Sequence, residues 1–214
     1  MKFIPIQQKA FDILALNSTI KGDFYLTGGT ALSIFYLQHR ISADLDFFTE
    51  KNISVDFTNP LITLIAKKLK LNVRFTNIEN TLIYEFTDSH TLKLKVDFAY
   101  YPYKRLEKGL SCQGVKVDSL VDIGANKIAA INNRNEVKDF VDCFFVLKHY
   151  TLWDLLRAYE HKFGMELDLV LLASNLLKVK TFDYLPRMIE KITLKELKQY
   201  FIELTNRIGK RITE

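Results

Sequence analysis

One stretch near the N-terminus, residues 24–49, constrains the fold more than any other part of the chain. It reads FYLTGGTALSIFYLQHRISADLDFFT. Its opening apolar run ends at two glycines, which is typical of a strand followed by a tight turn. Residues 30–38 then carry apolar side chains at helical spacing, and residues 45–48 are apolar again. The stretch therefore predicts a strand, a glycine turn, a helix and a second strand that carries Asp44 and Asp46.

The two acids of this second strand are of the type that binds divalent cations. Residues two apart on a strand point to the same side, so Asp44 and Asp46 are expected to project together. Two such carboxylates raise one another's pKa unless a cation lies between them, and Mg²⁺ takes oxygen ligands of this kind together with substrate phosphates. Gly28 and Gly29 would let backbone N–H groups approach a phosphate at a helix start. A nucleotide site is one interpretation, and a surface turn with two solvated acids is the other.

A third acid stands on a later strand. Residues 91–98 alternate between apolar and polar side chains, which places Asp97 on the polar side together with Lys93 and Lys95. A third carboxylate from a separate strand is what a two-metal phosphoryl-transfer site requires. The lysines could neutralise phosphate, or they could be edge-strand lysines that only resist aggregation.

From Asp118 onward the pattern changes to helices. Lys127 lies on the same side as a buried apolar stripe, so its ammonium must reach a polar rim or an anion. In the next predicted helix Asp139 and Asp142 are three residues apart and share a face. Spacing alone would make these acids members of surface ion pairs. Further helices are expected over residues 153–163, 167–177, 188–189 and 194–208.

Taken together, these motifs resemble the signature of the AbiEii/AbiGii-type nucleotidyltransferase toxins, within the DNA-polymerase-β-like nucleotidyltransferase superfamily. The first part of the resemblance is carried by Gly28, Gly29, Thr30, Ala31, Leu32, His39, Arg40, Ser42, Asp44 and Asp46. Lys95-Val-Asp97 is similar to the family's Lys-x-Asp strand. The later motif is matched by Ala125, Lys127, Arg134, Lys138, Asp139 and Asp142.

The resemblance implies an α+β fold, with a polymerase-β-like core in which a mixed sheet is flanked by helices, followed by a C-terminal helical bundle. We expect the nucleotidyltransferase core over residues 1–117 and a helical domain that contributes to the active-site cleft over 118–214. The implied reaction moves a nucleoside monophosphate from an NTP to an acceptor hydroxyl, with a tRNA 3′ end as the acceptor. The implied biological role is that of a toxin paired with a cognate antitoxin protein.

The resemblance also assigns roles to residues. The metal ligands, for Mg²⁺ or Mn²⁺, are expected to be Asp44, Asp46 and Asp97. The nucleotide contacts are expected to be Gly28, Gly29, Thr30, Arg40, Ser42, Lys127 and Asp139. Lys127 and Asp142 join the three metal ligands as expected catalytic residues. Whether Asp139 or Asp142 holds the later motif together stays open, with Asp142 slightly preferred.

Two other functions are consistent with the same residues. One is a non-catalytic nucleotide- or RNA-binding module on the same scaffold, although the presence of all three carboxylates counts against it. The other is a protein nucleotidylyltransferase or kinase-like toxin, since transfer to a Ser, Thr or Tyr hydroxyl would use a similar metal site.

Composition and charge further restrict the expected partners, the expected use of the cysteines and the expected location of the protein. The chain has 214 residues, a net charge of +5 and a pI of about 9.0, which favours a polyanionic partner such as RNA. Its two cysteines, Cys112 and Cys143, indicate neither a disulfide framework nor a zinc site. The N-terminus lacks the apolar core of a signal peptide and no apolar run reaches membrane-spanning length, so we expect a cytoplasmic protein without a membrane partner.

Overall fold

The computed structural model describes residues 2–213, which divide into two compact units. The first unit contains the residues up to Tyr36, Ser42–Lys104 and Lys108–Ser119. The second contains Leu37–Ile41, Arg105–Glu107 and the chain from Leu120 onward. Two short segments therefore belong to the second unit although they lie far from its other residues in sequence.

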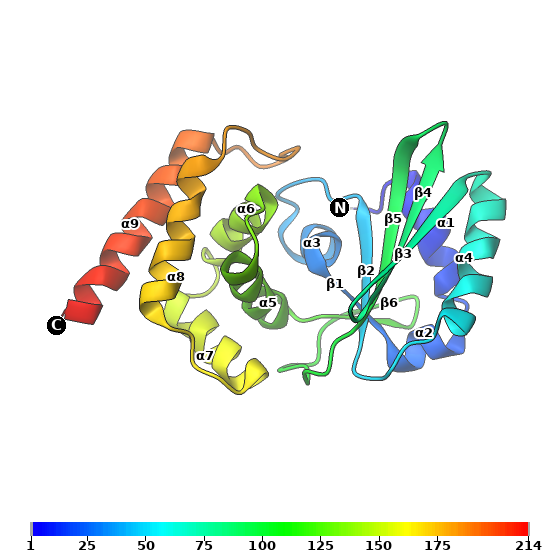
Figure 1. The fold of residues 1–214 in the computed structure, drawn as a ribbon, viewed down its shortest axis with the longest axis horizontal. Coiled ribbons are helices and arrows are strands. Elements are labelled where there is room, and N and C mark those ends of the chain that lie inside the picture. The colour runs from blue at the N-terminus through cyan, green and yellow to red at the C-terminus, as the bar shows by residue number, and fades with distance from the viewer. Residues whose placement is uncertain (1, 214) are drawn as a thin grey trace. The chain divides into compact units, whose positions relative to one another are not determined.

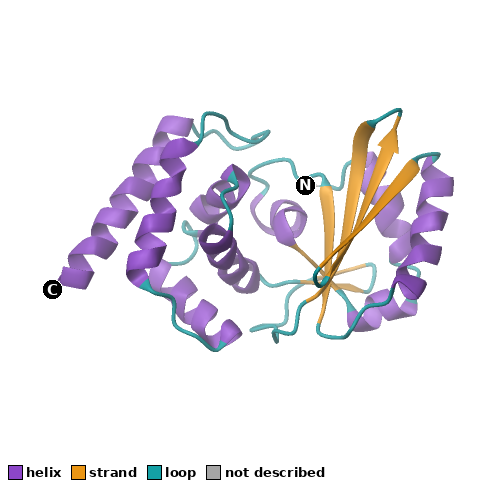
Figure 2. Cartoon of the chain, viewed as in Figure 1, coloured by secondary structure: helices purple, strands orange, loops and turns teal. Residues whose placement is uncertain are grey.

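The first unit is built on a seven-stranded mixed sheet (Figures 1 and 2). Its strands are β1 (Tyr25–Thr27), β2 (Asp44–Thr49), β3 (Asn72–Ile78), β4 (Thr81–Asp88), β5 (Thr91–Tyr100), β6 (Ser111–Cys112) and β7 (Val115–Val117). They follow the spatial order β3-β4-β5-β2-β1-β7-β6. β2 pairs antiparallel with β1 and parallel with β5, so the central strand that carries two acids lies beside the strand that carries the third.

Apolar packing decides which face of this sheet the acids occupy. The helices of the unit are α1 (Pro5–Leu14), α2 (Ser18–Asp23), α3 (Gly28–Ala31) with the π-helix η1 (Leu32–Leu37), and α4 (Val55–Leu69). α1 and α4 cover one face, with α3 on the other (Figure 1). Phe47 is fully buried and stacks between Phe11 of α1 and Phe98 of β5, at centroid distances of 6.3 and 5.6 Å. Because side chains alternate along a strand, Asp44 and Asp46 face away from α1.

The expected turn at the two glycines differs in detail from the structure. Gly28 and Gly29 are the first residues of α3 and not a separate loop, and the helical segment ends at Leu37. The next residue, Gln38, has a φ of 52°, in the left-handed region that ends a helix.

The second unit is helical. It contains α5 (Leu120–Asn133), α6 (Val137–Val146), α7 (Leu152–Phe163), α8 (Leu169–Leu176), the 3₁₀ helix η2 (Leu177–Thr181) and α9 (Leu194–Thr213). The predicted helix at residues 188–189 is wrong. Met188 instead forms a β-bridge with Arg40, and Ile41 donates its N–H to the Arg187 carbonyl at 2.8 Å. The backbone groups of this segment are thus used by residues 39–41.

Buried polar contacts explain why residues 105–107 belong to the second unit. The Asp122 carboxylate of α5 accepts the N–H groups of Leu106 and Glu107 at 2.9 and 3.2 Å. It also forms an ion pair with Lys162 of α7 at 2.6 Å, and both side chains are fully buried. No helix in the described part of the chain is both long and apolar enough to cross a membrane.

Candidate active site

The register of β2 and β5 brings three acids onto one face of the sheet. In this parallel pair Asp44 lies opposite Lys95, and Asp46 lies opposite Asp97. Neighbouring strands are about 4.8 Å apart, so the side chains of Asp46 and Asp97 project next to one another. Residues separated by more than fifty positions in the sequence therefore form one acidic cluster, which we call the carboxylate face (Asp44, Asp46 and Asp97).

A lysine provides the counter-charge within the carboxylate face. Lys95 Nζ lies 2.5 Å from Asp97 Oδ2. Burial, the largest influence, lowers the pKa of Lys95, but the hydrogen bond and the charges of Asp97, Asp46 and Asp44 outweigh it and the pKa is raised. Within residues 2–213, no three His, Cys, Asp or Glu side chains are grouped closely enough to hold a metal ion as they stand.

Gly28 fits against the carboxylate face without space to spare. Its φ is +71°, and a Cβ at this position would lie 2.2 Å from Asp46 Oδ2. A residue with a side chain would thus be strained in its backbone and would clash with the carboxylate. The backbone at the start of α3 can therefore approach the acid only because residue 28 is glycine.

A buried hydrogen-bond network fixes the chain where it enters β2. Thr30 Oγ1 donates to the Asp44 carbonyl at 2.5 Å. Gln7 Nε2 donates to the Ser42 and Asp44 carbonyls at 3.1 and 3.2 Å. Thr30, one of the expected nucleotide contacts, thus has a fully buried hydroxyl that binds the backbone of β2.

Gln7 was missed by the sequence analysis. It is 1% exposed, and it stands three residues before Ala10 and seven before Leu14, on the buried face of α1. A polar side chain at helical spacing with an apolar stripe was the signal that could have identified it, because such a group is buried only when it finds hydrogen-bond partners.

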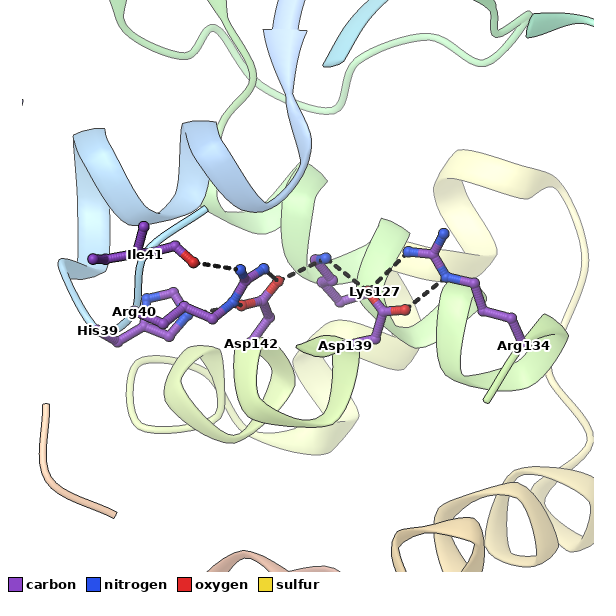
Figure 3. Close-up of polar contacts among 7 residues, drawn as sticks. All are labelled: His39, Arg40, Ile41, Lys127, Arg134, Asp139 and Asp142. Carbon is purple, nitrogen blue, oxygen red and sulfur yellow. Dashed lines mark hydrogen bonds and ion pairs between the residues drawn. The ribbon is translucent and has the colours of Figure 1, made fainter. Parts of the chain in front are cut away.

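The second unit contains a buried cluster of charges centred on Asp142 of α6 (Figure 3). Arg40 binds the carboxylate with two nitrogens, Nε at 2.6 Å from Oδ1 and Nη2 at 2.8 Å from Oδ2. His39 Nε2 lies 2.7 Å from Oδ1, and Lys127 Nζ lies 2.7 Å from Oδ2. Asp142 is fully buried, and Arg40 is 3% exposed. Arg40 thus forms a two-point ion pair with an acid of α6.

Lys127 joins this carboxylate to a second one. Its ammonium also lies 2.8 Å from Asp139 Oδ1, and Arg134 binds Asp139 at 2.6 Å. Figure 3 shows Lys127 between the two aspartates. The interpretation of Asp139 and Asp142 as surface ion-pair residues is wrong, because both are 0% exposed. Both acids thus bind Lys127. We call these three residues, together with His39, Arg40 and Arg134, the buried ion network.

Charge pairing offsets the cost of burial in this network. Burial alone would raise the pKa of Asp142, but Lys127, Arg40 and His39 hold it well below the usual range of aspartate. Asp139 has a lowered pKa for similar reasons, with Lys127 and Arg134 opposing burial. The pKa of Lys127 is raised, since the two aspartates outweigh its burial and the repulsion of Arg40. The network therefore keeps Lys127 charged.

Comparison with known proteins identifies the family. A protein-family model described as "Nucleotidyl transferase AbiEii toxin, Type IV TA system" matches residues 12–205.

The chain belongs to this family.

The chain is also similar to one further sequence and to solved structures. An uncharacterised protein of Aquifex aeolicus (strain VF5) is 35% identical over 138 residues, which is 64% of this chain and 63% of that protein, less than two thirds of its length. Two Helicobacter pylori structures show the same fold as this AbiEii-family chain. JHP933 has a TM-score of 0.59 at 22% identity, covering 97% of this chain and 90% of that one. A candidate nucleotidyltransferase has a TM-score of 0.60 at 21% identity, covering 97% and 93%. The expected mixed α+β fold is confirmed.

The buried ion network predicts a large effect of Asp142→Asn in this AbiEii-family chain. The substitution leaves Arg40 and Lys127 buried with one carboxylate fewer, which we expect to lower the free energy of unfolding by about 3–5 kcal/mol. Arg134→Gln is the matched control, because the Arg134 side chain is 52% exposed and its loss should cost at most about 1 kcal/mol. Urea unfolding at neutral pH measures both, and equal stabilities of the two variants would contradict the prediction.

The network also predicts acid sensitivity. A carboxyl with a lowered folded pKa stabilises the fold above its unfolded pKa of about 3.9 and loses that contribution as pH falls through the folded value. Because Asp142 and Asp139 are both of this kind, stability should fall below about pH 4. The Asp142→Asn variant should show a flatter acid limb in unfolding curves measured from pH 7 to pH 3. A limb as steep as that of the wild type would rule out Asp142 as its source.

Gly28→Ala tests the contact between α3 and Asp46. The new Cβ must displace the carboxylate, and the positive φ alone costs about 1–2 kcal/mol. We expect a lower melting temperature. Gly22→Ala in α2 is the control, because a Cβ there meets nothing within 4 Å and alanine favours the helix. An unchanged melting temperature for Gly28→Ala would mean that Asp46 moves aside freely.

Proposed function

We propose that this chain is a metal-dependent nucleotidyltransferase that moves a nucleoside monophosphate from an NTP to the 3′ hydroxyl of a tRNA, as a toxin opposed by a cognate antitoxin. The observation that carries the proposal is the register of β2 and β5, which aligns Asp46 with Asp97 and leaves Asp44 on the same face. Membership of the AbiEii family supports the reaction type.

The donor set of the carboxylate face fits a hard divalent cation. Aspartate oxygens are the protein ligands that Mg²⁺ and Mn²⁺ prefer, and Asp44, Asp46 and Asp97 supply them. When bound, such a cation neutralises charge on the triphosphate and on the attacking oxygen. Asp97 would position the acceptor hydroxyl, and the backbone N–H groups at Gly28 and Gly29 would bind phosphate oxygens. Phosphoryl transfer needs positioning and charge more than a nucleophilic side chain.

Residues of the later motif have proposed roles as well. Lys127 would offset charge that develops on the leaving pyrophosphate. Asp139 and Asp142 would act on it as positioning residues, since they keep its ammonium charged at a fixed place in the second unit. Arg40 and Ser42 stay as proposed nucleotide contacts, although the guanidinium of Arg40 already binds Asp142.

The tRNA acceptor rests on the family resemblance and on the net charge of +5, which favours a polyanionic partner. A non-catalytic module on this scaffold would bind NTP or RNA without releasing pyrophosphate. A protein nucleotidylyltransferase would release pyrophosphate but place the nucleotide on a protein hydroxyl. Incubation with each α-labelled NTP, total tRNA and cell protein separates the three functions by which macromolecule carries the label.

Asp44→Asn tests the proposed metal role. We expect a folded protein with a normal melting temperature and no transfer of label to tRNA in the presence of Mg²⁺, because one of three ligands has lost its charge. Asp88→Asn, at the exposed β4–β5 turn of the same sheet, is the control and should keep full activity. Normal transfer by the Asp44→Asn variant would remove the metal role from this residue.

Lys95→Met tests whether the ammonium competes with a metal ion for Asp97. Without nucleotide, we expect tighter Mn²⁺ binding by calorimetry, tenfold for about every 1.4 kcal/mol of competing attraction removed. Lys93→Met, at an exposed position on the same strand, should leave the Kd unchanged. Weaker binding in the Lys95→Met variant would show that the lysine supports the metal and does not compete with it.

A further inference from the structure

Two hollows lie on the surface of the second unit along α9. One, of about 380 Å³, is lined by residues that include Phe144, Lys191, Glu196 and Glu203. The other, of about 360 Å³, lies where the start of α7 meets α9. Tyr200 lines both. Their volumes are in the range of small-ligand sites, so charge and lining chemistry decide what each could bind.

The hollow at α7 combines aromatic rings with positive charge. Its lining includes Tyr150, Trp153, Tyr200 and Arg207 and contains no Asp or Glu, whereas the neighbouring hollow contains two glutamates. The guanidinium of Arg211 lies 4.3 Å from the centroid of the Trp153 ring. Residues 204–213 carry three cations and no acid. This hollow, which we call the aromatic hollow, thus favours an anionic ligand with a flat apolar part.

The charges that face the aromatic hollow from α7 do not reverse this preference. Burial and the charges of Glu107 and Asp154 raise the pKa of Tyr150 in the lining. Asp154 belongs to the capping box at the start of α7. Its carboxylate accepts the N–H and the hydroxyl of Thr151 at 2.9 and 2.7 Å. These bonds hold the carboxylate at the helix start. Arg207, in contrast, belongs to the lining itself and has an exposed side chain.

We propose that the aromatic hollow binds one nucleotide of single-stranded RNA, with the base against the Trp153, Tyr150 and Tyr200 side chains and the phosphate on Arg207. Aromatic side chains bind bases of any sequence by stacking, and arginine pairs well with phosphate. The neighbouring hollow is a poorer candidate, because the charges of Glu196 and Glu203 offset those of Lys148 and Lys191 in its lining. This inference rests on the proposed function in taking RNA as the acceptor, and it adds a binding site in the second unit.

The chain contains an intrinsic fluorescent probe at this site. Trp153 is its single tryptophan, so tryptophan emission reports on the aromatic hollow alone. We would titrate the full chain with an unlabelled single-stranded oligoribonucleotide, without NTP or divalent metal. We expect saturable quenching that weakens with salt.

Variants locate the phosphate contact. Arg207→Gln should raise the Kd about fivefold at 0.1 M salt and reduce the salt slope by about 0.7, the contribution of one phosphate contact on a single strand. Arg211→Gln should weaken binding in the same direction. Lys195→Gln, an exposed lysine in the first turn of α9 that lines neither hollow, is the control and should bind as the wild type does.

The outcomes distinguish this site from the proposed function. Quenching by RNA that persists in the Asp44→Asn variant supports the site independently of transfer. Transfer activity without quenching would overturn the site and leave the proposed function intact. Unchanged binding in both arginine variants, or quenching by an NTP as strong as by the oligoribonucleotide, would also overturn it. RNA binding seen only by anisotropy of a labelled strand would place the RNA elsewhere on the protein.

Discussion

The parallel pairing of β2 with β5 is the constraint on which the candidate site depends. A shift of one residue in this register would turn Asp97 to the opposite face from Asp46, because side chains alternate along a strand. The register is held by the apolar side of the same strands, where Phe47 stacks on Phe98 and both are fully buried. The aromatic core therefore determines where the acids point, and the acids themselves contribute repulsion that Lys95 offsets.

Local periodicity explains what could be predicted from the sequence. The alternation in residues 91–98 and the Asp-x-Asp spacing of β2 indicate which side chains share a face, because a strand has a fixed period of two. Helical spacing likewise indicates that Lys127 is near the buried side of α5, and it is 6% exposed. The family resemblance added the order of these motifs along the chain. None of these signals states which distant residue each polar group contacts.

The contacts that could not be predicted are the long-range ones. Arg40 and Asp142 are 102 positions apart, and neither residue's local pattern identifies the other as its partner. Gln7 reaches the carbonyls of Ser42 and Asp44 across more than thirty positions. The segment at Met188 lacks regular structure of its own and uses its backbone to pair with Arg40. In each case the tertiary fold supplies the hydrogen-bond partner of a buried polar group. The spacing of residues along the chain does not indicate which residue that partner is.

The net charge of each cluster gives a physical reason for the nucleotide substrate that we propose. The three carboxylates and Lys95 together give the carboxylate face a net charge of −2, which suits a divalent cation. In the buried ion network, two aspartates against Arg40, Lys127 and Arg134 leave +1 when His39 is counted as neutral, which suits an anion. A metal-bound triphosphate presents both signs. The net charge of each cluster thus has the sign that attracts one part of such a molecule.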